Sequence, residues 1–393
     1  MDASSIVRLG IIGLGNIGTA HAVSIYSGNI QGAKLAAICD ISQNRLKYAE
    51  ENFDGVTLFE NYHDLMVSGL CDAVIVATPH KLHTEIAESA LSSGLHVLVE
   101  KPVDIAVSRA KRINEIAQKS DRLFAIMFNQ RTSPMFKRLR EIVKSGQLGA
   151  IKSINWIITN WYRTQYYYDS SSWRATWCGE GGGVLMNQSV HNLDIWQWIF
   201  GMPDEITAFC DQARYHNIEV EDSAVIYARY KNGATGIFST STGECPGTNR
   251  LEVCGELGKI VVEGGKLKWW RLKESERKIC FEEKESFVEP PFDYEEYIPT
   301  ERETAHVGVI TAFVQKILGS GELIANGCEG INELMISNAA YLSTWLGNKP
   351  VSLPIDADEY DRHLLDHMKA SPDKNGGSDE THTGYSSRWS VNW

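Results

Sequence analysis

The sequence lacks the features that mark membrane, secreted and nucleic-acid-binding proteins. No run of about 18 apolar residues is present, so no membrane span is predicted. The N-terminus has neither the basic region nor the apolar core of a signal peptide, which favours a cytoplasmic protein. The 38 Lys and Arg residues form no cluster and are outnumbered by 50 acidic residues. Neither nucleic acid nor an anionic membrane is therefore an expected partner.

Cysteine is scattered and is never paired at metal-binding spacing. The eight cysteines show no CxxC motif, which argues against a zinc site and against a disulfide framework. We therefore expect reduced thiols and no bound metal. With 393 residues, of which 43% are hydrophobic, the chain is long enough for two domains with a sizeable core.

Strand-like and helical segments alternate through the first third of the chain. Short apolar runs are followed by segments with helical spacing of apolar residues, which is the pattern of βαβ units around a mostly parallel sheet. The predicted strands span residues 7–12, 34–39, 73–77, 96–99 and 123–128, and the predicted helices span 17–27, 84–92 and 107–118. We expect an α/β fold with a Rossmann NAD-binding domain over residues 1–128.

The first predicted strand ends in the motif GLGNIG. In such a motif Gly13 permits a tight turn, Gly15 lets the backbone approach a pyrophosphate, and Gly18 lets helix and strand pack closely. The N–H groups of the first helical turn, which includes Asn16 and Ile17, would hold the phosphate charge. These five residues are predicted to bind a dinucleotide.

Asp40 lies at the end of the second predicted strand. A carboxylate at this place would accept hydrogen bonds from the adenosine ribose and would repel a 2′-phosphate, which favours NAD over NADP as the cofactor. Alternatively, Asp40 caps a helix over residues 42–50. The two roles are compatible.

Two further loops follow strands at the edge of the sheet where ligands bind in this architecture. Residues 77–83 read ATPHKLH, and residues 99–102 read VEKP. The members of these loops that we expect at the cofactor are Thr78, Pro79, His83, Glu100 and Lys101. A lysine just past a buried strand is costly to desolvate unless it faces a polar group, although a plain surface turn is the alternative.

The middle of the chain predicts a second domain with a mainly antiparallel sheet. Hairpin signals separate some of its strand-like runs. These runs span residues 151–160, 205–211, 223–230, 234–241, 250–254 and 259–263, and helical patterns cover 133–145, 301–318 and 329–346. We assign residues 129–365 to a substrate-binding and oligomerisation domain. Residues 366–393 are expected to form a flexible tail, whose Trp389 and Trp393 could dock on a neighbouring subunit.

A glycine-rich segment precedes a predicted helix over residues 184–200. One face of that helix would carry Asn187, His191, Asp194 and Trp198. This face mixes polar and aromatic groups where a packed helix would carry aliphatic ones. A histidine on a helix is nevertheless more often structural than catalytic, and Asp194 is more simply explained as a buried hydrogen-bond partner.

The segment over residues 161–177 is unusually aromatic. Aromatic rings stack on the C–H faces of pyranose rings, and arginine side chains bind hydroxyl groups. Arg163, Trp173 and Arg174 are therefore predicted to bind a ring-bearing substrate. Packing at an oligomer interface is the alternative for such a segment.

Together, these motifs resemble the glucose–fructose oxidoreductase/inositol dehydrogenase/MocA (Gfo/Idh/MocA) family of oxidoreductases. The resemblance covers about residues 7–354 and rests on GLGNIG, the Asp40 strand end, ATPHKLH, EKP and GEGGGVLMNQSVHNLDIWQW at 179–198. It implies a C-terminal α+β domain with a large open, mainly antiparallel sheet, whose outer face forms the oligomer interface in many members. Members usually act on sugars, polyols or their derivatives with NAD or NADP.

The resemblance also implies the chemistry of the site. His191 would take the proton of the substrate hydroxyl while hydride leaves for the nicotinamide, and Lys101 would stabilise the alkoxide. Many members carry Asp where this chain has Asn187, which orients a substrate but cannot take a proton. His191 is then the main base. His306 is expected at a helix surface or an interface.

We therefore expect an NAD-dependent dehydrogenase that oxidises a secondary hydroxyl of a cyclic sugar or glycoside, with C3 of glucosides as one candidate. An enzyme that recycles NAD, for net glycoside hydrolysis or isomerisation, uses the same motifs. A non-catalytic NAD-binding regulator is the third reading, but it would have little need for Lys101 and His191 together. A homo-oligomer formed through the C-terminal sheet is expected.

Overall fold

The computed structural model describes residues 6–371, so most of the predicted tail, with Trp389 and Trp393, lies outside the described residues. The N-terminal part folds around a six-stranded parallel sheet with the order β3-β2-β1-β4-β5-β6. Its strands are β1 (Val7–Ile12), β2 (Ala33–Cys39), β3 (Thr57–Phe59), β4 (Ala73–Val76), β5 (His96–Val99) and β6 (Phe124–Ile126). The order reverses between β1 and β4, as in dinucleotide-binding Rossmann sheets. The predicted Rossmann domain is confirmed.

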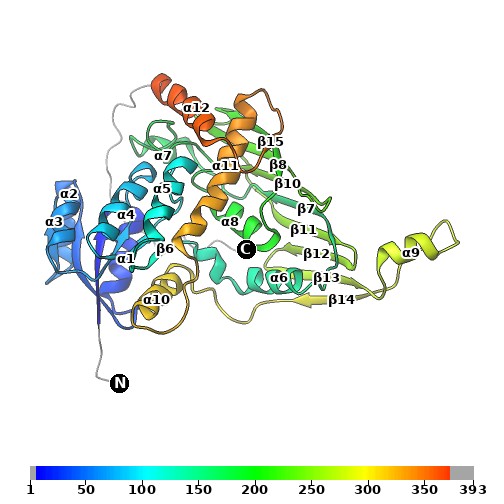
Figure 1. Ribbon diagram of the computed structural model, residues 1–393, viewed down its shortest axis with the longest axis horizontal. Coiled ribbons are helices and arrows are strands. Elements are labelled where there is room, and N and C mark those ends of the chain that lie inside the picture. The colour runs from blue at the N-terminus through cyan, green and yellow to red at the C-terminus, as the bar shows by residue number, and fades with distance from the viewer. Residues whose placement is uncertain (1–5, 372–393) are drawn as a thin grey trace.

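Helices cover both faces of this sheet (Figure 1). They are α1 (Asn16–Tyr26), α2 (Gln43–Asn52), α3 (Tyr62–Val67), η1 (His80–Leu82), α4 (His83–Ser92) and α5 (Val107–Ala117). Because successive side chains of a strand point to opposite faces, Leu9 packs in one apolar cluster with Ile25, and Val76 packs in another with Ile86. Phe313, from α10 (Ala305–Ile317), joins the cluster of Leu9, so a helix from the expected second domain covers the first sheet.

The second sheet has nine strands in the order β14-β13-β12-β11-β7-β10-β9-β8-β15. Its strands are β7 (Ile151–Ile158), β8 (Glu205–Gln212), β9 (Glu221–Arg229), β10 (Thr235–Ser241), β11 (Asn249–Gly255), β12 (Gly258–Glu263), β13 (Lys266–Leu272), β14 (Phe292–Tyr297) and β15 (Val351–Ser352). All neighbours are antiparallel except β7 and β10. The predicted mainly antiparallel sheet is confirmed.

The remaining helices of the described chain gather mostly between the two sheets (Figure 1). They are η2 (Asn129–Thr132), α6 (Pro134–Lys144), α7 (Gln165–Asp169), α8 (Val190–Phe200), α9 (Glu276–Glu282), η3 (Gly327–Glu329), α11 (Gly330–Trp345) and α12 (Ala357–Ala370). Trp156 on the sheet is buried on the side that α6 covers, whereas its neighbour Ile157 is 43% exposed. None of the described helices is long and apolar enough to cross a membrane.

The structure differs from the sequence prediction at several places. Helix α8 begins at Val190 instead of residue 184, so Asn187 precedes the helix and does not share its face. Helix α12 continues to Ala370, past the expected start of the tail at 366. The strands β13 and β14, with α9 between them, were not predicted. The connection that carries α9 projects away from the rest of the molecule (Figure 1).

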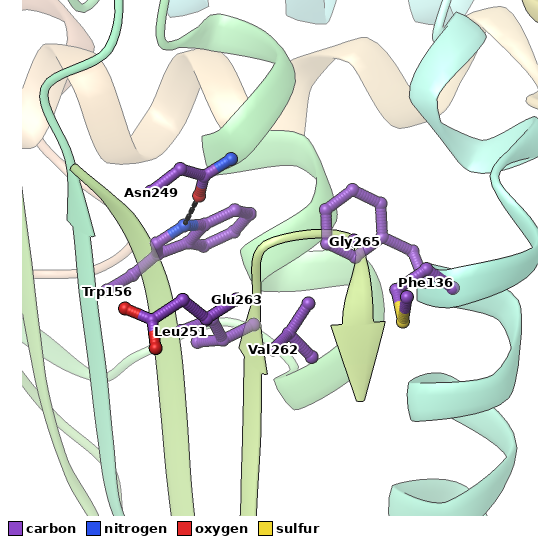
Figure 2. Close-up of a pocket in the computed structure, with 8 residues that line it drawn as sticks. Phe136, Trp156, Asn249, Leu251, Val262, Glu263 and Gly265 are labelled. Atoms are coloured by element: carbon purple, nitrogen blue, oxygen red, sulfur yellow. Dashed lines mark hydrogen bonds between the residues drawn. The ribbon is translucent and has the colours of Figure 1, made fainter. Parts of the chain in front are cut away.

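A small cavity lies between α6 and the second sheet (Figure 2). Its lining residues are Met135, Phe136, Trp156, Asn249, Leu251, Val262, Glu263 and Gly265. The one hydrogen bond among the residues drawn joins Trp156 Nε1 to Asn249 Oδ1 at 3.1 Å. None of the predicted site residues lines this cavity, and we assign it to helix–sheet packing.

Candidate active site

The GLGNIG loop is shaped by backbone packing at two of its glycines. Gly13 has a φ of +94°, and a Cβ at this position would lie 2.7 Å from the carbonyl oxygen of Ala77 at the end of β4. A Cβ on Gly18 would overlap the carbonyl oxygen of Gly13. Both positions therefore require glycine, which is what lets α1 begin directly against the end of the sheet.

Gly15 differs from these two glycines, because no atom lies within 4 Å of the place where its Cβ would be. It is the N-cap residue of α1, and no side chain caps the helix, whose first turn contains Asn16 and Ile17. Open space in front of a helix N-terminus without a side-chain cap suits a pyrophosphate, which the N–H groups of the first turn and the helix dipole would hold. The loop thus fits a dinucleotide.

Asp40 is tied to the loop on one side and to the next helix on the other. Its carboxylate accepts hydrogen bonds from Leu14 N at 2.6 Å and from Ser42 N at 2.8 Å. Ser42, not Asp40, is the N-cap residue of α2. Each carboxylate oxygen can accept a second hydrogen bond, so Asp40 keeps the capacity to bind a ribose hydroxyl.

The two loops after β4 and β5 are held together by His83. Its buried ring lies with Nδ1 2.7 Å from Pro102 O and with Nε2 2.7 Å from Thr78 O. Thr78 Oγ1 is buried without a hydrogen-bond partner in the described chain, and Pro79 leads into η1. His83 therefore shapes both loops through their backbones, and its ring nitrogens are already engaged.

Glu100 is a buried carboxylate next to Lys101, and His21 on α1 is its partner. His21 Nε2 lies 2.7 Å from Glu100 Oε1, and the backbone N–H of Lys101 donates to Oε2 at 3.2 Å. Burial raises the pKa of Glu100, but the contact with His21 outweighs it and sets the pKa at about 2. Glu100 is therefore a fixed negative charge beneath the lysine.

Lys101 reaches from the first domain to the second. Its Nζ donates to the backbone carbonyl of Asn187 at 3.1 Å, and this is its one side-chain hydrogen bond to the described residues. Burial lowers the pKa of Lys101, while the charges of Glu100 and Glu180 oppose that shift. Two of the three ammonium N–H directions remain for a bound hydroxyl oxygen.

His191 is a buried imidazole whose environment favours the neutral form. It is the second residue of α8, its side chain is buried, and Nδ1 has no hydrogen-bond partner in the described chain. Burial lowers its pKa well below 6.5, and the charge of Lys101 lowers it further. A buried imidazole with a free nitrogen is unusual in a structural role, and it suits a group that accepts a proton.

Asp194, by contrast, is a structural residue, as predicted. Its carboxylate accepts two hydrogen bonds from the buried guanidinium of Arg131, at 2.8 Å and 2.7 Å. Gln197 donates to the same carboxylate at 2.9 Å. The ion pair is buried, and these three hydrogen bonds engage the carboxylate. Asp194 therefore serves the fold and not the chemistry of the site.

The aromatic segment lies partly at the site. The ring of Trp173 packs edge-on against His80 with centroids 5.4 Å apart, and the guanidinium of Arg174 lies over the ring of Tyr167 at 4.3 Å. Arg174 also hydrogen-bonds the hydroxyl of Tyr167, which lies 3.5 Å from Asn187 Nδ2. Arg163 is less directly placed, because its guanidinium donates to two backbone carbonyls of its own segment.

Three titratable residues near the site were missed or misplaced by the sequence reading. Glu180 contacts Asn187, and His21 pairs with Glu100. His306 is not at a free helix surface, because its ring lies 5.5 Å from that of His21, and burial lowers its pKa to about 4. Nothing in the sequence indicated the pair of His21 and Glu100, because this pair joins α1 to the residue after β5 and the two residues are far apart in the chain.

Among the described residues, no cluster of His, Cys, Asp or Glu is arranged to hold a metal ion.

A glycine loop at the edge of a Rossmann sheet, with a lysine and a neutral histidine beside it, defines a dinucleotide-dependent oxidoreductase. The chain belongs to the Gfo/Idh/MocA family. Residues 7–128 match the family's "Oxidoreductase family, NAD-binding Rossmann fold", and residues 136–261 match its C-terminal domain. The cofactor of this domain is NAD.

Known relatives and solved structures agree with this membership. Myo-inositol 2-dehydrogenase of Thermotoga maritima is 29% identical over 263 residues, which cover 65% of this chain and 75% of the relative. Inositol 2-dehydrogenase of Rhizobium meliloti is 24% identical and covers 86% and 96%, respectively. The WlbA dehydrogenase of Bordetella pertussis, solved with NADH and UDP-GlcNAcA, is 26% identical with a TM-score of 0.75, over 89% of this chain and 100% of that one.

Proposed function

We propose that this protein oxidises a secondary hydroxyl of a cyclic sugar, glycoside or other sugar conjugate, with C3 of the sugar ring as the first position to test. The observation that carries the proposal is the juxtaposition of Lys101, anchored on Asn187 O at 3.1 Å, with the buried neutral His191. The relatives named as inositol dehydrogenases and the WlbA dehydrogenase solved with UDP-GlcNAcA support a polyol or sugar substrate.

The chemistry divides between these two side chains. When bound, NAD supplies the hydride acceptor beside the carbon that is oxidised. Lys101 donates a hydrogen bond to the substrate oxygen and stabilises the negative charge that develops on it. His191 accepts the hydroxyl proton as the C–H hydride leaves, so the C–O bond becomes a carbonyl with all atoms accounted for.

The remaining predicted residues orient the partners. The GLGNIG loop, Asp40 and the backbones of Thr78 and Pro79 would hold NAD. Asn187, whose backbone carbonyl binds Lys101, would contact the substrate together with Arg174 and Trp173. Aromatic and guanidinium groups suit a sugar ring with several hydroxyls better than a small open-chain alcohol.

The proposal is tested by following NADH absorbance while free sugars, inositols, glycosides and nucleotide sugars are screened with NAD and NADP in parallel. We expect NADH to form in proportion to the oxidised product. Product formed without net NADH would instead support cofactor recycling. A chain that binds NAD but turns over no polyol or sugar would contradict the proposal.

A further inference from the structure

Glu180 is a buried carboxylate for which the mechanism above has no use. Its side chain is 2% exposed, and it lies directly before the glycine triplet at 181–183. Oε2 accepts a hydrogen bond from Ala175 N at 2.6 Å, Oε1 accepts one from Asn187 Nδ2, and the guanidinium of Arg174 lies 3.8 Å away. A carboxylate is costly to bury unless such donors and charges compensate it.

This contact fixes the direction of the Asn187 amide. An ionised carboxylate only accepts hydrogen bonds, so the NH2 group of Asn187 must face Glu180 and the side-chain carbonyl must face away. The hydrogen bonds found for the Asn187 side chain within the described residues are both made by Nδ2, to Glu180 and, at 3.5 Å, to the hydroxyl of Tyr167. The backbone carbonyl of Asn187 meanwhile accepts from Lys101 Nζ at 3.1 Å. Asn187 therefore presents an oriented acceptor close to the ammonium group.

The charges of Glu180 and Lys101 also act on each other. Burial lowers the pKa of Lys101 and raises that of Glu180, and the attraction between the two groups opposes both shifts. The other titratable groups that act on Lys101 are Glu100, Arg174 and Glu333. Among these, Glu180 is the carboxylate that also contacts a predicted substrate-binding side chain.

We propose that Glu180 is a positioning residue of this active site. It orients Asn187 so that Oδ1 accepts a hydrogen bond from the hydroxyl next to the one being oxidised, and its charge balances that of Lys101. The substrates are then ring compounds with adjacent hydroxyls, vicinal diols, and not isolated secondary alcohols. The specificity part rests on the proposed function, whereas the charge part does not.

The specificity part is tested with Glu180→Gln, whose amide can donate to Asn187 Oδ1 and so reverse the Asn187 amide. For the best substrate we expect kcat/KM to fall about tenfold to a hundredfold, because the adjacent hydroxyl loses its acceptor. For the analogue deoxygenated at that neighbouring carbon, the variant and the wild type should agree within about threefold. An equal loss on both substrates would overturn the specificity part.

The charge part is tested on the free protein, without turnover. The rate at which acetic anhydride acetylates Lys101 is followed against pH by mass spectrometry. Glu180→Gln removes the balancing charge, so the pKa of Lys101 should fall and its acetylation at neutral pH should rise by about threefold or more. Glu180→Asp keeps the charge and should leave the rate near that of the wild type.

Glu219→Gln is the matched control, because Glu219 also accepts a backbone hydrogen bond, from Trp177 N at 2.6 Å, but has no bond to Asn187. It should change neither acetylation nor the diol preference, and thermal melting should confirm that all variants are folded. An unchanged acetylation rate in Glu180→Gln would overturn the charge part. A wild type without sugar turnover would refute the proposed function alone, since the acetylation result still decides the role of Glu180.

Discussion

Lys101 and His191 come from different domains, and their distinct environments suit distinct tasks. The lysine keeps its charge between Glu100 and Glu180, while the histidine is buried without a charge partner. Lys101→Ala and His191→Ala should each lower kcat by about a hundredfold or more, the usual scale for acid–base groups. NAD binding, measured by fluorescence titration, should be retained. Turnover within about threefold of the wild type would refute the roles assigned to these residues.

The same environments set the pH dependence of the reaction. The pKa of His191 lies well below 6.5, so the neutral base is already present at mildly acidic pH. The pKa of Lys101 lies below 10.5, so the charged form is lost earlier than for a free lysine as pH rises. A plot of kcat/KM against pH should therefore show its acid limb below 6.5 and its alkaline limb below 10.5.

Lys101→Arg serves as the control for that profile. A guanidinium does not lose its proton in this range, so the alkaline limb should move to higher pH while the acid limb stays in place. An acid limb at or above pH 6.5 would show that His191 is not the neutral base.

At the scale of the elements, two glycines at the start of α1 allow an effect on NAD binding to be distinguished from an effect on the stability of the fold. Gly15 faces open space with a φ of −66°, so Gly15→Ala should be tolerated by the fold but should obstruct the pyrophosphate. We expect NAD affinity to fall about tenfold or more with little change in Tm. Gly18→Ala would press a methyl group on Gly13 O and should cost roughly 2–4 kcal/mol of unfolding free energy. Calorimetry for binding and denaturant titration for stability distinguish the two effects, and similar Tm losses in both variants would contradict this account.

Five of the six strands of the parallel sheet could be predicted from sequence because each is a short apolar run between helical patterns, whereas β3, which is not buried, was missed. The start of α8 could not. The carboxylate of Glu221 accepts hydrogen bonds from Gly183 N at 2.8 Å and from Leu185 N at 2.9 Å, which draws this backbone away from the helix. Glu221 is 36 or more residues away from Gly183 and Leu185 in the sequence, so the spacing of residues around 184–200 does not reveal these hydrogen bonds. The Glu180–Asn187 pair escaped prediction because it forms within the resulting turns.

At the scale of the whole molecule, the second sheet leaves one face open, and apolar side chains lie on it. The exposed members on the central strands are Ile157, Phe209, Val225 and Ile237. Phe209 lies directly opposite Val225 in the register of β8 and β9, whereas Ser239 separates Val225 from Ile157. Exposed apolar side chains on an open sheet face are typical of an interface with another copy of the chain. The oligomer expected from the family resemblance would use this face.

The double substitution Val225→Glu and Ile237→Glu tests that expectation. Two carboxylates buried at a self-complementary interface would lack partners, so the oligomer should dissociate. Size-exclusion chromatography with light scattering should give a multiple of 43.9 kDa for the wild type and 43.9 kDa for the variant. Val67→Glu, on the surface of α3, is the control, because Val67 is 77% exposed and remote from this sheet. A wild type that is monomeric at micromolar concentration, or a variant that keeps the wild-type mass, would rule out assembly through the open face.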